Sequence, residues 1–175
     1  MRRNADGFTL VELVATVAVL AILLSLATPA FGRIAEHSRK TSALHRLTSS
    51  LALARISAVR LGIPITACPS HDGRSCRGDS DWSEGWIVYA DPQRTSSPLD
   101  DSKVLEASDG LGSGIAVLGT VGRQRLRFSP HGWSAGYNQT VRLCSSDGRL
   151  LARLIVNNAG RTRTETPPEG TPCSV

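Results

Sequence analysis

The chain opens with a stretch that is almost entirely hydrophobic. Glu12 is the only charged residue between Phe8 and Arg33. A helix of about 20 apolar residues is long enough to cross a bilayer. The pattern therefore predicts a hydrophobic, membrane-spanning helix over residues 8–32, preceded by a short polar leader at residues 1–7.

An amphipathic continuation of the helix is predicted at residues 33–62. Its apolar side chains recur three or four positions apart, which places them on one helix face. These side chains belong to Leu44, Leu47, Leu51, Ala54, Ala58 and Leu61. Gly62 and Pro64 predict the end of the helix, because glycine favours the position after a helix and proline cannot continue one.

Residues 63–175 consist of short apolar or alternating runs separated by turns rich in Gly, Asp, Ser and Pro, which is typical of antiparallel strands. The predicted strands are Pro64–Ala67, Trp86–Ala90, Val104–Ala107, Ile115–Leu118, Arg125–Ser129, Thr140–Cys144 and Leu150–Val156. Asp147 and Gly148 predict a hairpin turn between the last two strands. The expected fold is therefore α+β, a long N-terminal helix packed on an antiparallel β-sheet domain.

Charge is distributed unevenly along the 175 residues, which together carry a net charge of +5. Residues 67–121 hold four basic and nine acidic side chains, whereas residues 122–175 hold eight basic and three acidic ones. Of the 20 basic residues, 18 are Arg, whose planar guanidinium suits phosphate and carboxylate. A GC-rich coding sequence would produce the same bias without functional meaning. A polyanion is expected to favour the C-terminal third.

All four cysteines lie outside the hydrophobic segment, at Cys68, Cys76, Cys144 and Cys173. An even number in an exported domain predicts two disulfides formed in an oxidising compartment. Three pairings are possible. We favour the pairing of sequence neighbours, Cys68 with Cys76 and Cys144 with Cys173.

A carboxylate near the start of a membrane helix is costly and requires a partner. The segment Gly7-Phe8-Thr9-Leu10-Val11-Glu12-Leu13 resembles the class III signal of type IV prepilins and type II secretion pseudopilins. The resemblance implies that prepilin peptidase cleaves between Gly7 and Phe8, that Phe8 is N-methylated, and that Glu12 registers subunits in a filament. It implies a single pass through the bacterial inner membrane before the subunit enters a periplasmic or extracellular filament. A cytoplasmic N-terminus agrees with the basic Arg2 and Arg3.

The globular part is similar to the minor pilins of the GspH/FimT family. The similar blocks are Asp81–Asp91 (DWSEGWIVYAD), Leu126–Gly132 (LRFSPHG) and the closing segment Leu154–Arg163. The likeness implies a type IV pilin-like fold and partners among other pilins and minor pilins.

The segment Gly160-Arg161-Thr162-Arg163 matches a Gly-Arg-x-Arg tail motif with which a subset of FimT-type pilins binds DNA during natural transformation. In an extended chain Arg161 and Arg163 point the same way, and Gly160 lets the backbone turn and approach a ligand closely. Because no groove-reading helix is evident, we predict sequence-nonspecific contact with DNA phosphates. Solvated tail charges, or ion pairs with Glu165 and Glu169, are the competing interpretation.

Other arginines extend the same hypothesis. Arg123, Arg125 and Arg127 alternate along a predicted strand and are candidates for a wider phosphate-binding face, although they equally suit the polar side of a half-buried strand. Weaker candidates are Arg142, Arg149 and Arg153. Among the aromatic residues, Trp133 and Tyr137 are candidates for ligand contact, whereas Trp82, Trp86 and Tyr89 suit the core or a subunit interface.

No catalytic arrangement is evident in the sequence. The four histidines, His37, His45, His71 and His131, lack the spacing of zinc ligands. The aspartates between positions 72 and 81 lack the regular spacing of a Ca²⁺ loop. We therefore expect no enzyme activity, no metal and no cofactor. An assembly-priming minor pilin or a type II secretion pseudopilin, neither binding DNA, remains the alternative.

Overall fold

The structure is a computed structural model, and it describes residues 9–112 and 114–174. The chain divides into two compact units, Met1–Ser38 and Arg39–Val175. The predicted leader, residues 1–7, and the predicted methylation site, Phe8, lie outside the described residues.

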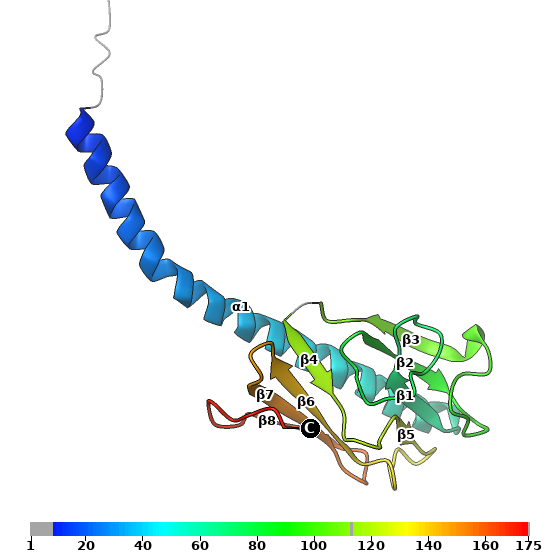
Figure 1. The fold of residues 1–175 in the computed structure, drawn as a ribbon. Coiled ribbons are helices and arrows are strands. Elements are labelled where there is room, and N and C mark those ends of the chain that lie inside the picture. Colours follow the sequence, from blue (N-terminus) through cyan, green and yellow to red (C-terminus); the bar gives the residue numbers. More distant parts are fainter. Residues whose placement is uncertain (1–8, 113, 175) are drawn as a thin grey trace, which may run out of the picture. The chain divides into compact units, whose positions relative to one another are not determined.

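One long helix, α1 (Leu10–Leu61), begins in the first unit and ends in the second (Figure 1). Thr9 caps it, because the Glu12 backbone N–H donates to Thr9 Oγ1 at 3.3 Å. This is one half of the capping box that a Thr-x-x-Glu sequence favours. In the first unit the large apolar side chains of α1 that the structure describes are exposed, Leu10 by 79%. Within the described parts of the chain, no helix combines the length and the hydrophobicity needed to cross a membrane.

The second unit buries one face of α1. Its buried apolar side chains are those of Ala43, Leu47, Leu51, Ala54 and Ala58, which confirms most of the predicted seam. Of the other two predicted positions, Leu44 is half-buried against the hydrophobic cluster. Leu61 closes the last helical turn and is 45% exposed. The helix stops there because Gly62 adopts a φ of 66°, a left-handed conformation that glycine takes without steric cost.

Among the described residues of this unit, eight strands form two antiparallel four-stranded sheets (Figure 1). The first sheet has the order β3–β2–β1–β5, and the second has the order β4–β6–β7–β8. The strands are β1 (Ile65–Pro69), β2 (Gly85–Ala90), β3 (Val104–Asp109), β4 (Ile115–Leu118), β5 (Leu126–Phe128), β6 (Gln139–Ser145), β7 (Leu150–Val156) and β8 (Thr162–Glu165). A short 3-10 helix, Asp101–Lys103, precedes β3.

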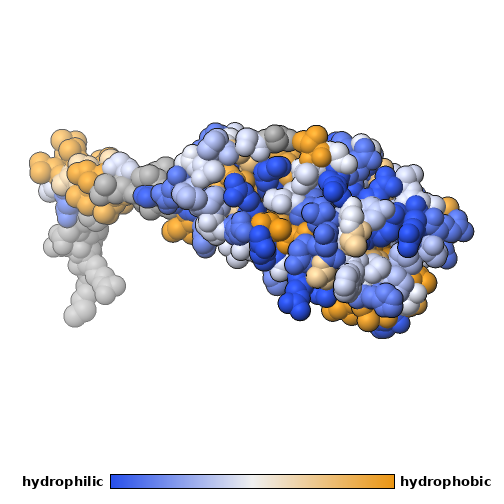
Figure 2. Space-filling model, turned by 90° about the horizontal axis from the view of Figure 1, so that it is seen from below, coloured by the Kyte–Doolittle hydropathy of each residue, from blue (hydrophilic) through white to orange (hydrophobic). Residues whose placement is uncertain are grey.

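One hydrophobic cluster joins α1 to both sheets. It includes Leu51 of the helix, Val88 and Phe128 of the first sheet, and Leu143 and Leu154 of the second. Trp82, Trp86 and Tyr89 are also fully buried, so the aromatic residues of the acidic segment belong to the interior of the unit. Hydrophilic side chains cover much of the face of this unit that Figure 2 shows.

Seven strands lie where the alternating pattern predicts them, with ends that differ by a few residues. The hairpin at positions 145–148 joins β6 to β7, with Gly148 at a φ of 80°. Its turn is fixed by Asp147, which accepts hydrogen bonds from Ser145 Oγ and Arg149 Nε. These two donors lower the pKa of the Asp147 carboxyl to about 2. The eighth strand, β8, was not among the predicted strands.

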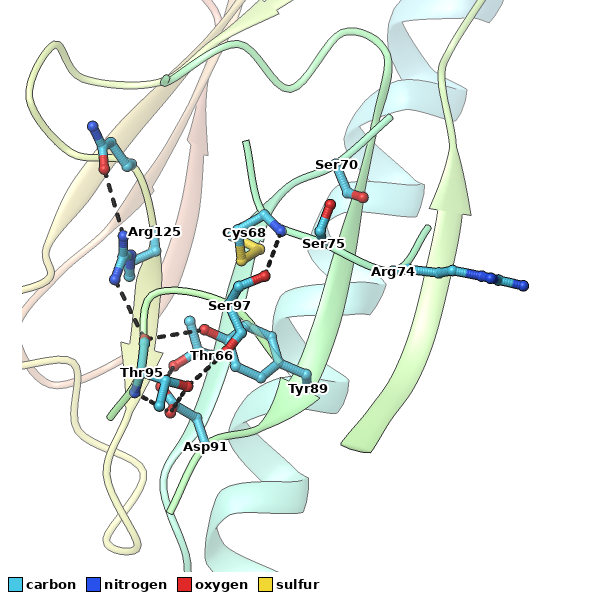
Figure 3. The surroundings of a disulfide bond; sticks show 12 residues. Thr66, Cys68, Ser70, Arg74, Ser75, Tyr89, Asp91, Thr95, Ser97 and Arg125 are labelled. Atoms are coloured by element: carbon cyan, nitrogen blue, oxygen red, sulfur yellow. Dashed lines mark hydrogen bonds between the residues drawn. A yellow bond between two sulfur atoms is a disulfide. The ribbon is translucent and has the colours of Figure 1, made fainter. Parts of the chain in front are cut away.

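Two disulfides join Cys68 to Cys76 and Cys144 to Cys173, which is the neighbour pairing favoured from the sequence. The first closes a loop beside β1, where the Cys76 N–H donates to Ser97 Oγ at 3.0 Å (Figure 3). The second returns the C-terminal segment to the β6–β7 hairpin, where the Cys173 N–H donates to the Gly148 carbonyl oxygen at 2.8 Å. The segment that follows β8 is therefore tied to the sheet.

Candidate nucleic-acid interface

Sheet β4–β6–β7–β8 turns one face toward the hydrophobic cluster and the other away from it. On β7 the side chains of Leu154 and Val156 are buried, whereas those of Arg153 and Ile155 are half-buried. Successive side chains of a strand point to opposite faces. Arg153 and Ile155 therefore lie on the outer face of this sheet.

Strand register brings further arginines onto that face. Arg142 of β6 is paired with Arg153, and Arg163 of β8 is paired with Ile155. The pairing extends one residue ahead of β8, because the Asn157 N–H donates to the Arg161 carbonyl oxygen at 3.1 Å. The outer face thus carries Arg142, Arg153, Arg161 and Arg163, which we call the basic face.

The guanidiniums of the basic face have few protein partners. Arg163 Nε lies 3.2 Å from Glu165 Oε1 in an ion pair whose arginine side chain is 65% exposed. Arg142 Nη1 makes a long contact of 3.5 Å to the Gly119 carbonyl oxygen. Arg153 and Arg161 have no side-chain partner among residues 9–112 and 114–174. Four positive charges, offset by one carboxylate, therefore remain available to an anion.

Gly160 is needed for packing rather than for contact with a ligand. It is buried with a φ of 71°, and a Cβ at this position would collide with the Gly132 carbonyl oxygen and lie 3.3 Å from the Phe128 ring. The prediction that Gly160 approaches a ligand closely is therefore corrected. Its backbone approaches the loop after β5, and this contact fixes the point at which Arg161 enters the sheet.

Arg127 does not belong to the predicted phosphate-binding face. Its side chain lies in the interior, with Nη2 and Nε at 2.6 and 2.9 Å from Asp91 Oδ2. Nη1 donates to the Tyr137 hydroxyl at 2.6 Å, and the guanidinium lies over the Tyr137 ring, 5.0 Å from its centroid. The alternation of Arg123, Arg125 and Arg127 suggested a shared outward face, but the buried carboxylate of Asp91 draws Arg127 inward.

Arg123 and Arg125 do not join the basic face either. Both precede β5, which belongs to the other sheet. Arg123 Nη1 donates to the Gly136 carbonyl oxygen. Arg125 Nη1 reaches the Thr95 carbonyl oxygen at 3.4 Å (Figure 3). Both side chains therefore stabilise loops around β5.

A polar cluster surrounds Asp91 beneath the loop at positions 91–97 (Figure 3). Thr66 Oγ1 and the Thr95 N–H donate to the two oxygens of the Asp91 carboxylate, at 2.7 and 2.6 Å. Burial, and secondarily the negative charge of Asp91, raises the pKa of Tyr89 to about 12. The Tyr89 phenol therefore stays protonated and donates to the Thr95 carbonyl oxygen at 3.4 Å.

No group of metal-binding side chains occurs within the portion of the chain that the structure describes. The aspartates of the loop at positions 70–81 form hydrogen bonds and an ion pair with other residues of the same loop. Asp72 accepts from Ser75 Oγ and from the backbone N–H groups of Ser75 and Arg74, and these bonds hold the pKa of its carboxyl well below the usual range. Asp79 pairs with Arg77 at 2.7 Å.

Models of known protein families match most of the chain. The family described as type II transport protein GspH matches residues 43–160. The prokaryotic N-terminal methylation motif matches residues 2–28. No curated protein matches the chain in sequence.

Several solved structures share the fold. The type IV minor pilin FimU of Pseudomonas aeruginosa is 22% identical with a TM-score of 0.57, over 77% of this chain and 94% of that one. The minor pseudopilin EpsH from the type 2 secretion system of Vibrio cholerae is 14% identical with a TM-score of 0.51, over 74% and 98%. Escherichia coli GspH is 14% identical with a TM-score of 0.53, over 77% and 93%. The TM-scores show a common fold. At identities this low, the comparison carries no information about ligands.

Proposed function

Since the chain belongs to the GspH family of minor pilins and pseudopilins, we propose that it is a minor subunit of a type IV pilus that binds extracellular DNA for natural transformation. The observation that carries the proposal is the basic face. It gathers guanidiniums from three strands on one exposed surface, next to a chain end held by a disulfide.

The chemistry of the basic face suits the phosphate backbone of DNA. Arginine presents its donors in a planar fork that matches two phosphate oxygens. The outer surface of a sheet offers no helix for the major groove, so the contacts are expected to position the backbone without reading bases. The Arg163–Glu165 pair opposes this binding only weakly, because exposed ion pairs contribute at most about 1 kcal/mol.

The N-terminal methylation motif marks a prepilin-type, membrane-anchored protein that interacts with prepilin peptidase and with other pilins. In the proposed pathway, the peptidase cleaves between Gly7 and Phe8, and Phe8 is methylated. Residues 8–32 hold the subunit in the inner membrane, with the N-terminus cytoplasmic, until Glu12 registers it in the filament. The globular unit then reaches the periplasm or the cell exterior.

Replacing Arg161 and Arg163 with Gln is expected to weaken DNA binding by the full chain in detergent about tenfold or more, because each charged hydrogen bond to a phosphate is lost. Each phosphate contact contributes about 0.9 to the slope of log affinity against log salt. The slope should therefore fall by about 2 units. Fluorescence anisotropy with a labelled duplex over a salt series measures both quantities.

A matched control removes two charges elsewhere. Arg60 is exposed on α1, and Arg74 is 73% exposed in a surface pair with Asp101. The variant with Arg60→Gln and Arg74→Gln should bind like the unmodified chain. Equal affinities for all three proteins would refute the role of the basic face. A lack of DNA binding at low salt would instead favour an assembly-priming minor pilin or a type II secretion pseudopilin.

A further inference from the structure

A pocket of about 190 Å³ lies beside β5. Its lining includes Pro64, Arg94, Arg127, Trp133 and Tyr137. The volume is below the roughly 300–1,000 Å³ of pockets for drug-sized ligands. The pocket therefore suits one planar ring rather than a large molecule.

Trp133 makes one wall of the pocket and is 59% exposed. The other two tryptophans of the chain, Trp82 and Trp86, are fully buried. An indole left in water next to a pocket offers a stacking surface for a second aromatic ring. The pocket thus has a built preference for a flat, unsaturated group.

Arg127, which lines the pocket, offers it a hydrogen-bond donor. Arginine has five N–H donors, and the contacts of Arg127 with Asp91, Thr66, Thr95 and Tyr137 occupy four of them. One N–H on Nη1 has no partner among the described residues, although the Arg127 side chain is more than nine-tenths buried. A ring that carries an acceptor atom on its edge would satisfy it.

Arg94 adds a positive charge to the rim. It is exposed, and its guanidinium has no partner in the described parts of the chain. Its φ of 55° is the one left-handed φ of a non-glycine residue among those described, and such strain concentrates at binding sites. An aromatic wall, a free donor and an unpaired cation together match a base with its phosphate.

The pocket is connected to the basic face through one loop. The Ser134 N–H donates to the Asn158 carbonyl oxygen at 2.9 Å, and Gly160 packs on the carbonyl of Gly132. Trp133 lies between these two anchored positions, and Arg161 follows Gly160 directly. A strand bound along the basic face therefore passes close to the loop that carries Trp133.

We propose that this pocket holds one unpaired nucleotide, with its base stacked on Trp133 and its phosphate on Arg94. The inference rests on the proposed DNA-binding function and adds that a single-stranded segment or end of the DNA fills this pocket, whereas a blunt duplex contacts the basic face alone. A paired base cannot enter, because its edge and faces are already occupied in the duplex.

The test compares a labelled 20-nucleotide oligo(dT) with a blunt 20-base-pair duplex, each bound to the full chain in detergent. Stacking on one aromatic residue corresponds to a change in affinity of about five- to hundredfold. Trp133→Ala should weaken oligo(dT) binding by this factor and leave duplex binding unchanged. Trp133→Phe should retain part of the affinity. Oligo(dT) should also quench the tryptophan fluorescence of the unmodified chain, because Trp133 is the exposed indole.

Leu99→Ala is the matched control, since Leu99 is an exposed apolar side chain that does not line the pocket. It should bind both DNAs like the unmodified chain. If the unmodified chain and Trp133→Ala bind oligo(dT) equally, the proposed nucleotide site is wrong. This holds even if the variant with Arg161→Gln and Arg163→Gln loses DNA binding. The proposal is also overturned if an aromatic peptide quenches the fluorescence of Trp133 and oligo(dT) does not. If neither DNA binds the unmodified chain, the proposed function itself fails.

Discussion

Replacing Asp91 with Ala is expected to lower the free energy of unfolding by about 3–5 kcal/mol. The substitution leaves the Arg127 guanidinium in the interior without its counter-ion, since Asp91 Oδ2 accepts from both Nε and Nη2. It also removes the acceptor for Thr66 and the Thr95 N–H. Urea unfolding of the full chain in detergent, followed by tryptophan fluorescence, measures the change.

Two further variants separate the loss of this pair from a general effect of removing charge. Asp101→Ala breaks the exposed pair with Arg74 and should change stability by less than about 1 kcal/mol. Asp91→Leu combined with Arg127→Met removes both buried charges and should recover much of the stability that Asp91→Ala loses. If Asp91→Ala were as mild as Asp101→Ala, the pair would not hold the loop at positions 91–97 on the sheet.

Removing the Cys144–Cys173 disulfide by two Cys→Ala substitutions is expected to cost about 3–4 kcal/mol of unfolding free energy. The bond spans 29 positions, so its loss frees a long loop in the unfolded chain. In the folded protein the segment after β8 would lose its covalent tie to β6. DNA affinity should therefore fall as well, because Arg161 and Arg163 would be held less rigidly. Denaturant unfolding and anisotropy measure the two effects.

The other disulfide supplies the comparison. Cys68 and Cys76 are 8 positions apart, for which the same loop-entropy relation gives about 2–3 kcal/mol. Its removal should leave DNA affinity unchanged, since it lies beside β1 in the first sheet. Equal DNA affinities for the two Cys→Ala pairs would show that the second disulfide does not order the basic face.

Elements with a strong hydrophobic period could be predicted from the sequence. The helix end at Leu61 follows from Gly62 and Pro64, and seven strands follow from short alternating runs. Strand β8 escaped this reasoning because Thr162 and Thr164 stand where an apolar side chain would mark the inner face. Its pairing with β7 is set by tertiary structure, because β7 is already in place beside it.

The candidate site was only partly predictable for a similar reason. Arg161 and Arg163 were identified from a motif four residues long, and Arg153 from its strand. The departure of Arg127 from that set depends on Asp91, which lies 36 positions earlier in the chain. Nothing in the local sequence around Arg127 distinguishes an arginine that faces water from one that binds a distant buried carboxylate.

Strand β8 is the last strand of its sheet, and this position gives its charges a second role. The backbone groups on the free side of an edge strand can pair with another chain, and charged side chains are a common defence against such association. Arg163 and Glu165 supply charges of both signs along a strand of four residues. The same arginine that we expect to contact DNA therefore also helps to keep globular units from joining edge to edge, so its replacement bears on solubility as well as on binding.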